Sequence, residues 1–134
     1  MILRKTLLAA AALAAVALPA LAHHSFAMFD NRNQTTWRGN VVSMRWANPH
    51  VFITIDVPAG SPQAGRWNIE GGSPNIMSRQ GWRRNSFAPG DPITIVGYPL
   101  RDGTRGGSLY YALDREGTRL YHDVNRSGGP AGGG

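Results

Sequence analysis

Cysteine is absent from the 134 residues of the chain. Without a thiol, the protein can form neither a disulfide framework nor a thiolate metal site, and it has no cysteine nucleophile and no thiol for lipoprotein attachment. Lysine occurs only once, at Lys5, and long apolar runs are confined to residues 7–18. A membrane-spanning helix needs about 20 consecutive apolar residues. We therefore expect no membrane span elsewhere in the chain.

The N-terminal region has the composition of an export signal. A positively charged start and an apolar run are followed by Ala20 and Ala22, the small-residue pattern that signal peptidase prefers. We predict that residues 1–22 are a cleaved signal peptide and that the mature protein starts at His23. The product is then expected in the periplasm or outside the cell, with no membrane span after cleavage.

Beyond residue 22, the chain carries its positive charge on arginine alone. This part has 12 arginines and eight acidic residues, which gives a net charge of +4 with neutral histidines. Guanidinium groups make planar, forked hydrogen bonds, so a basic face would suit carboxylates, phosphates or an acidic protein partner. The alternative is a solvated surface without a ligand. Because the protein is predicted to be exported, we expect no nucleic-acid partner.

One domain accounts for most of the mature chain. Residues 127–134 are mainly glycine and are expected to form a disordered tail, and residues 23–34 are predicted to form an N-terminal arm. The remaining residues, 35–126, are long enough for a single modest hydrophobic core.

Apolar and polar residues alternate along much of this domain. Val42, Met44 and Trp46 form one apolar series, and a second series occupies residues 51–57, as expected for half-buried strands. Further strands are predicted at residues 66–70, 92–98, 108–114 and 119–123.

A short helix separates two groups of predicted strands. Ser73 is suited to cap this helix, Pro74 to open it and Gly81 to end it, which predicts about two turns. Three strands, a short helix and two or three further strands are typical of the small barrel that binds oligonucleotides or oligosaccharides, the OB fold. We therefore predict a mostly β, five- or six-stranded OB-like barrel, in which Gly39 bends or bulges the first strand. Another small β-sandwich or roll is the alternative.

A set of short motifs is distributed along the chain. These motifs are Ala22-His23-His24-Ser25-Phe26, Trp37-Arg38-Gly39-x-Val41, Trp46-x-Asn48-Pro49-His50, Trp67-x-Ile69-Glu70, Gly81-Trp82 and Pro89-Gly90-Asp91-x-Ile93. Together they resemble a family of small exported bacterial proteins, domain-of-unknown-function family 6152, from residue 22 to about residue 120. The resemblance implies secretion and a small β domain, and it implies no particular activity.

Histidine offers the most specific chemistry in this sequence. Cleavage before His23 would expose an α-amino nitrogen beside the imidazole of the same residue, and these two nitrogens can chelate one metal ion. With His50 as the third ligand they would form a histidine brace, whose three nitrogens suit the tetragonal preference of Cu(II). An arm of about ten residues, which spans up to roughly 30 Å, can bring His23 to His50.

Other histidine interpretations remain open. His24 is an alternative ligand if the terminal amine, an amide and its own imidazole wrap the copper ion. Zinc is a further possibility, with Asp30 or Asp123 completing a tetrahedron. Alternatively, His50 hydrogen-bonds a backbone carbonyl at a sheet edge and binds no metal. We expect His122 to be a surface residue.

Aromatic and arginine residues suggest a second kind of site. Aromatic side chains on an open barrel face, combined with guanidinium groups, can bind anionic or flat ligands. Trp46 and Trp67 continue apolar alternations and are expected in the core. The predicted ligand-binding surface contains Trp37, Arg38, Trp82, Arg83 and Arg84.

Binding is favoured over catalysis by side chains alone. Ser25 lies close to a histidine and an aspartate in sequence, but on a predicted arm rather than a framework that would hold a triad and an oxyanion site. The leading hypothesis is a secreted periplasmic binding protein that holds copper through His23. Its partner would be the metal ion itself or a periplasmic protein to which it delivers the metal. The alternative is a metal-free interaction module that binds a protein, a peptide or a small anionic ligand through its aromatic and arginine surface.

Overall fold

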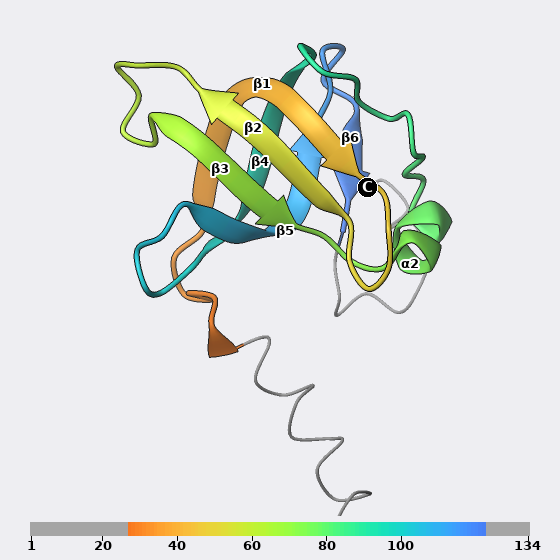
Figure 1. Cartoon of the computed structure of the whole chain (residues 1–134), viewed down its shortest axis with the longest axis horizontal. Helices are drawn as coiled ribbons and strands as arrows, with labels where there is room; N and C mark the ends of the chain where they lie inside the picture. The colour runs from red at the N-terminus through yellow and green to blue at the C-terminus, as the bar shows by residue number, and fades with distance from the viewer. Residues whose placement is uncertain (1–26, 123–134) are drawn as a thin grey trace, which may run out of the picture.

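The computed structural model describes residues 27–122, which contain six strands and the short helix α2 (Figure 1). The predicted signal peptide, the first part of the predicted arm, including His23 and His24, and the glycine-rich tail lie outside the described residues. No helix within residues 27–122 is long and apolar enough to cross a bilayer. The elements are β1 (Thr35–Arg45), β2 (Phe52–Val57), β3 (Gly65–Glu70), α2 (Pro74–Arg79), β4 (Pro92–Pro99), β5 (Gly106–Leu113) and β6 (Arg119–Tyr121).

Five of the strands close into a barrel. β1 pairs antiparallel with β2 and with β4, β2 pairs with β3, and β4 pairs with β5. A parallel pairing between β3 and the first residues of β5 completes the ring, and β6 pairs with the second half of β5. This is the strand order of an OB barrel. The predicted fold, a mostly β OB-like barrel with a short helix between the third and fourth strands, is confirmed.

A bulge lets β1 serve both halves of the barrel. Its register against β2 shifts between Val41 and Ser43, so the alternation of inward and outward side chains changes phase there. Trp37 and Val41 are buried before the bulge, whereas Met44 packs partly against the core after it. The bulge therefore lies a few residues after Gly39, where it was predicted.

At Gly39, the backbone of β2 lies so close to β1 that there is no room for a side chain. A β-carbon at this position would lie 2.2 Å from the carbonyl oxygen of Asp56. Because the obstructing atom belongs to the backbone of β2, no side-chain rotation can relieve the clash. The first strand therefore needs a residue without a β-carbon at this point.

The signals that predicted the helix act as expected. Ser73 is the N-cap, and its side-chain oxygen accepts a hydrogen bond from the Ile76 N–H at 3.3 Å. Pro74 is the first helical residue, and Gly81 follows the helix with φ of +96°. Met77 is fully buried and connects the helix to the core.

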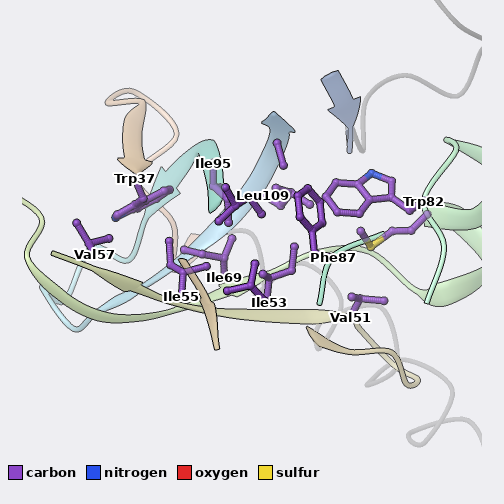
Figure 2. Close-up of a cluster of buried hydrophobic side chains, with 14 residues drawn as sticks. Trp37, Val51, Ile53, Ile55, Val57, Ile69, Trp82, Phe87, Ile95 and Leu109 are labelled. Carbon is purple, nitrogen blue, oxygen red and sulfur yellow. The ribbon is translucent and has the colours of Figure 1, made fainter. Parts of the chain in front are cut away.

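The hydrophobic core occupies the barrel interior, with Trp37 and Trp82 toward its opposite ends (Figure 2). Trp46 and Trp67, which were expected in the core, pack against it and remain partly exposed. The buried cluster consists of Trp37, Val41, Val51, Ile53, Ile55, Val57, Ile69, Met77, Trp82, Phe87, Ile93, Ile95, Leu109 and Ala112.

Trp37 and Trp82 are core residues, so their predicted place on a ligand-binding surface is wrong. Both side chains are 0% exposed. The Trp37 side chain points into the barrel from the part of β1 before the bulge. Its ring centroid lies 5.2 Å from that of Trp67. Trp82 directly follows the helix region, and its indole N–H donates a hydrogen bond to the Tyr121 carbonyl at 2.9 Å.

Candidate functional site

The outer face of the barrel carries a row of three unlike side chains at the start of β2. Phe52 points outward, and the sheet pairs it with Arg45 of β1 and with Glu70 of β3. The guanidinium carbon of Arg45 lies 4.9 Å from the centroid of the Phe52 ring, a cation–π contact. Within residues 27–122, Arg45 forms no ion pair with a carboxylate.

His50 lies at the Glu70 end of this row. Its Nδ1 contacts Oε1 of Glu70, and the two side chains are 39% and 23% exposed. Two backbone hydrogen bonds of 2.8 Å hold the segments together, one from the Val51 N–H to the Gly72 carbonyl and one from the Gly71 N–H to the Val51 carbonyl. The residues leading into β2 therefore run beside the residues leaving β3, which brings His50 to Glu70.

The carboxylate determines which ring nitrogen of His50 can accept a metal ion. Ionised glutamate only accepts hydrogen bonds, so the Nδ1 atom of His50 carries the hydrogen. In the neutral ring the lone pair is then on Nε2, which is the nitrogen able to coordinate. Carboxylate–histidine pairs of this kind orient metal-ligating imidazoles and raise their basicity.

A groove of about 260 Å³ lies along the same face. Met28, Phe29, Phe52 and Leu100 form its apolar walls, and Glu70 is among its polar residues. It lies on the outer side of β2 and β3, next to the connection from β4 to β5. In OB barrels this face, between the β1–β2 and β4–β5 loops, is where ligands bind.

The N-terminal segment reaches the barrel at this groove. The Arg101 N–H donates to the Met28 carbonyl at 2.9 Å, and Nε of Arg101 donates to the Phe29 carbonyl at 2.8 Å. Asp30 N–H in turn donates to the Pro99 carbonyl at 2.8 Å. Residues 28–30 are therefore anchored to the end of β4 and to Arg101, and Met28 and Phe29 line the groove together with Glu70.

A metal site on this face would need more donors than the described residues provide. Within residues 27–122 there is no group of three or more histidine, cysteine, aspartate or glutamate residues that could hold a metal ion. His50 and Glu70 alone provide one imidazole and one carboxylate. A complete site on this face needs donors from outside this set.

Comparison with known protein families shows to which family the chain belongs. The model of a family of unknown function, DUF6152, matches residues 10–109, well over half of the chain. The chain belongs to this family. No curated protein matches it significantly. The resemblance seen in the sequence motifs is therefore confirmed, and the matched range includes both His50 and Glu70 of this DUF6152 protein.

The three arginines predicted as ligand-binding residues do not gather at the groove. Arg38 is exposed on the outward side of β1, where it pairs with Thr94 of β4. Nη1 of Arg83 donates to the carbonyls of Ser78 at 3.2 Å and Trp82 at 2.9 Å. Arg83 therefore helps to close the C-terminal end of α2, and Arg84 is exposed next to it.

A different aromatic and arginine surface is present in the DUF6152 protein. All four tyrosines gather on β4, β5 and β6, with ring centroids 5.5 to 6.3 Å apart between neighbours. Arg119 stacks over two of the rings, at 4.5 and 5.5 Å from their centroids. Its Nη1 donates to the Tyr121 hydroxyl at 2.7 Å, and this hydrogen bond is the main reason that the pKa of Arg119 is raised. We call this set, Tyr98, Tyr110, Tyr111, Tyr121 and Arg119, the tyrosine cluster.

His122 is buried, contrary to the expectation of a surface position. It is 4% exposed, and its Nδ1 lies 3.0 Å from the side-chain oxygen of Gln80. The absence of a side chain at Gly72 makes room for the ring, because a β-carbon there would lie 2.3 Å from Cε1 of His122. The last described residue is thus packed beneath the end of the helix.

Glu70 is the site residue that sequence analysis missed. It was noted only as the end of the Trp67-x-Ile69-Glu70 motif. Alternation places Glu70 on the outward face of β3 and His50 on the outward side of the residues before β2. Their contact depends on the pairing of Phe52 with Glu70, which is a property of the sheet register and not of either strand alone.

Proposed function

We propose that this DUF6152 protein is an exported periplasmic protein that binds one copper ion through its processed N-terminus and His50. The α-amino nitrogen and the imidazole of His23 would supply two donors, and Nε2 of His50 a third. Three nitrogen donors of this kind suit the tetragonal geometry of Cu(II). Removal of residues 1–22 by signal peptidase is part of the proposal, because it creates the amine.

The observation that supports this proposal is the contact of His50 with Glu70, a residue that lines the groove at which the N-terminal segment arrives. Glu70 occupies Nδ1 of His50 and directs Nε2 towards coordination. Met28 and Glu70 line the same groove. His23 precedes Met28 by five residues, which span at most about 17 Å when extended.

The donor set favours copper over zinc. A closed tetrahedral zinc site would need a fourth protein ligand. The carboxylate of Asp30 is already engaged, since it accepts hydrogen bonds from the Asn33 side chain at 2.7 Å and the Arg32 N–H at 3.2 Å. These hydrogen bonds, that from Asn33 first, lower the pKa of Asp30. His24 and Asp123 remain alternative ligands. Replacing each of them by alanine, and measuring copper binding, tests whether it is one.

The test uses mature protein that begins with His23, titrated with Cu(II) and followed by electron paramagnetic resonance. One equivalent is expected to bind with a nitrogen-rich spectrum. Acetylation of the α-amino group of His23 removes the terminal chelate without altering the barrel, and His50→Ala removes the third nitrogen. Each change is expected to weaken binding at least tenfold. Equal copper uptake by both altered forms and by the native form would refute the proposal.

A metal-free interaction module is the second candidate, and the tyrosine cluster favours it. Four partly exposed rings and a guanidinium on one face suit a carboxylate-bearing peptide. A poly-glutamate peptide is a simple probe. We expect it to shift the tyrosine ring signals in NMR spectra of copper-free protein, and Arg119→Ala to abolish the shift. Unchanged tyrosine signals at saturating peptide would rule out this use of the surface.

A further inference from the structure

The groove on the outer face of β2 and β3 combines an aromatic wall with hydrogen-bonding side chains. The residues that carry this combination are Phe52, Asn68, Glu70, Thr104 and Arg105. The first three come from outward positions of β2 and β3, and the last two from the connection between β4 and β5. Two separate parts of the chain therefore place apolar and polar groups around one groove.

Several of these polar groups have hydrogen-bonding capacity that the described part of the chain does not use. Oδ1 of Asn68 accepts from the Thr54 hydroxyl at 3.3 Å, whereas Nδ2 donates to no group within residues 27–122. Over the same range, Arg105 forms no ion pair, and Glu70 contacts His50 through Oε1 only. An amide donor, a guanidinium and one carboxylate oxygen are thus available to a ligand.

The backbone around the groove is already paired. β2, β3 and the first residues of β5 each have a partner strand on both sides, because β3 runs beside the start of β5 (Figure 1). An extended peptide that binds by strand addition needs an unpaired strand edge. None of these three strands offers one along the groove within the described residues. A ligand in the groove must therefore be recognised by side chains.

The charge and size of the groove limit the ligand further. Among the described residues that line it, Glu70 is the only acid and Arg105 the only base. A nucleic-acid strand is held by several basic side chains along its phosphates, so this balanced charge does not favour it. The volume of about 260 Å³ is just below the range of about 300 to 1,000 Å³ for pockets that enclose a drug-sized ligand. The groove therefore suits one ring-sized unit of a longer chain.

We propose that this groove binds one ring of an oligosaccharide. Sugar hydroxyls both donate and accept hydrogen bonds, so they match donors from Asn68 and Arg105 and an acceptor at Oε2 of Glu70. The C–H face of the sugar ring packs against Phe52, which supplies apolar contact area. Other OB barrels bind oligosaccharides on this face. The inference goes beyond the proposed function and does not depend on it, since none of these groups is a proposed copper ligand.

The test is titration of the copper-free mature protein with chitotetraose, cellotetraose and maltotetraose, followed by two-dimensional NMR. We expect at least one tetrasaccharide to shift the backbone amides of residues 104–107 and the side-chain amide of Asn68. Phe52→Leu, Asn68→Ala and Arg105→Gln should each weaken that binding by about fivefold or more, because each removes an aromatic contact or a hydrogen bond. If none of the three sugars shifts these amides in the native protein, the inference is overturned.

Tyr111→Leu is the matched control for Phe52→Leu. It also exchanges an aromatic ring for leucine, but within the tyrosine cluster on β5. We expect it to leave oligosaccharide binding unchanged, and a loss as large as that of Phe52→Leu would overturn the groove as the binding site. A poly-glutamate peptide and a single-stranded oligonucleotide are titrated in parallel. If either of them shifts the groove amides and the sugars do not, the groove serves that other class of ligand and the inference fails.

Discussion

At the scale of single residues, Glu70 has a role that its exposure alone would not suggest. Its side chain is 23% exposed, so the ion pair with His50 is partly screened by solvent and is expected to contribute little to stability. Its effect on His50 is directional, because it occupies one ring nitrogen and orients the other. Glu70 is therefore a positioning residue for the proposed copper ligand.

Replacement of Glu70 by glutamine tests this role. Glutamine keeps the size of the side chain and still accepts a hydrogen bond, but it removes the negative charge that faces Nδ1 of His50. We expect Glu70→Gln to weaken Cu(II) binding by about 10- to 100-fold, measured by competition titration, with little change in the free energy of unfolding. Asp56→Asn is the matched control, since it removes the other carboxylate ion pair on this sheet, to Arg66, away from the groove. Equal losses in the two variants would contradict a specific role for Glu70.

A substitution at Gly39 tests steric crowding alone, because an added β-carbon would meet the backbone of β2 while the residue has no positive φ. Alanine at this position would place its β-carbon against the Asp56 carbonyl, and the backbone of β2 would have to move. We expect Gly39→Ala to lower the free energy of unfolding by about 1 to 3 kcal/mol or more in urea denaturation. Gly103→Ala is the control, because Gly103 has φ of +79° with open space around it and should cost only about 1 kcal/mol of strain. A smaller loss at Gly39 than at Gly103 would show that β1 can shift away from β2.

At the scale of elements, the strands and the helix could be predicted from local patterns, whereas their mutual register could not. The helix from Pro74 was predictable because its cap, its proline and its closing glycine are all local signals. The phase of β1 was not, because the bulge after Val41 reverses which residues face inward. That reversal is why Trp37 was assigned to the surface. The contact of His50 with Glu70 depends on register in the same way.

A hydrogen bond from Trp82 helps to hold strand β6 against the barrel. The Trp82 indole donates to the Tyr121 carbonyl from a fully buried position. Trp82→Phe loses this hydrogen bond and leaves a cavity, so we expect a loss of about 1 to 3 kcal/mol in unfolding free energy. Amide hydrogen exchange in β6 should accelerate more than exchange in β2.

Trp67→Phe is the matched control for this prediction. It also removes an indole hydrogen bond, to the Gln63 carbonyl at 2.6 Å, but from β3, which forms no pairing with β6. We expect it to leave exchange in β6 unchanged. Faster exchange of β6 in both variants would mean that the strand responds to global stability rather than to Trp82.

At the scale of the whole molecule, the barrel brings together two segments that are far apart in sequence. Residues 28–30 are held by the end of β4 and by Arg101, and His50 contacts Glu70 at the end of β3. Met28, Phe29 and Glu70 line one groove. The sequence could predict His50 and an arm long enough to reach it. It could not predict that the arm joins the barrel beside the carboxylate partner of His50, because that position depends on how β4 and β5 close the ring.

The thermal stability of the copper-loaded protein measures what the fold adds to the site. The amine and imidazole of His23 are adjacent in the unfolded chain as well, so their copper affinity cancels between the two states and does not stabilise the fold. Only the ligand that folding brings into place, His50, contributes to a shift in Tm. We expect excess Cu(II) to raise the Tm of the mature protein, by about 4 to 8 °C for each kcal/mol of added binding energy in a domain of this size.

His50→Ala should bind Cu(II) more weakly through His23 and show almost no rise in Tm, as measured by circular dichroism with and without copper. The Nα-acetylated form should likewise show almost no rise, because it lacks the terminal chelate that anchors the ion. An equal rise in native protein and in His50→Ala would mean that copper recognises the folded barrel without His50. Residues of the barrel other than His50 would then have to account for the copper-induced rise in Tm.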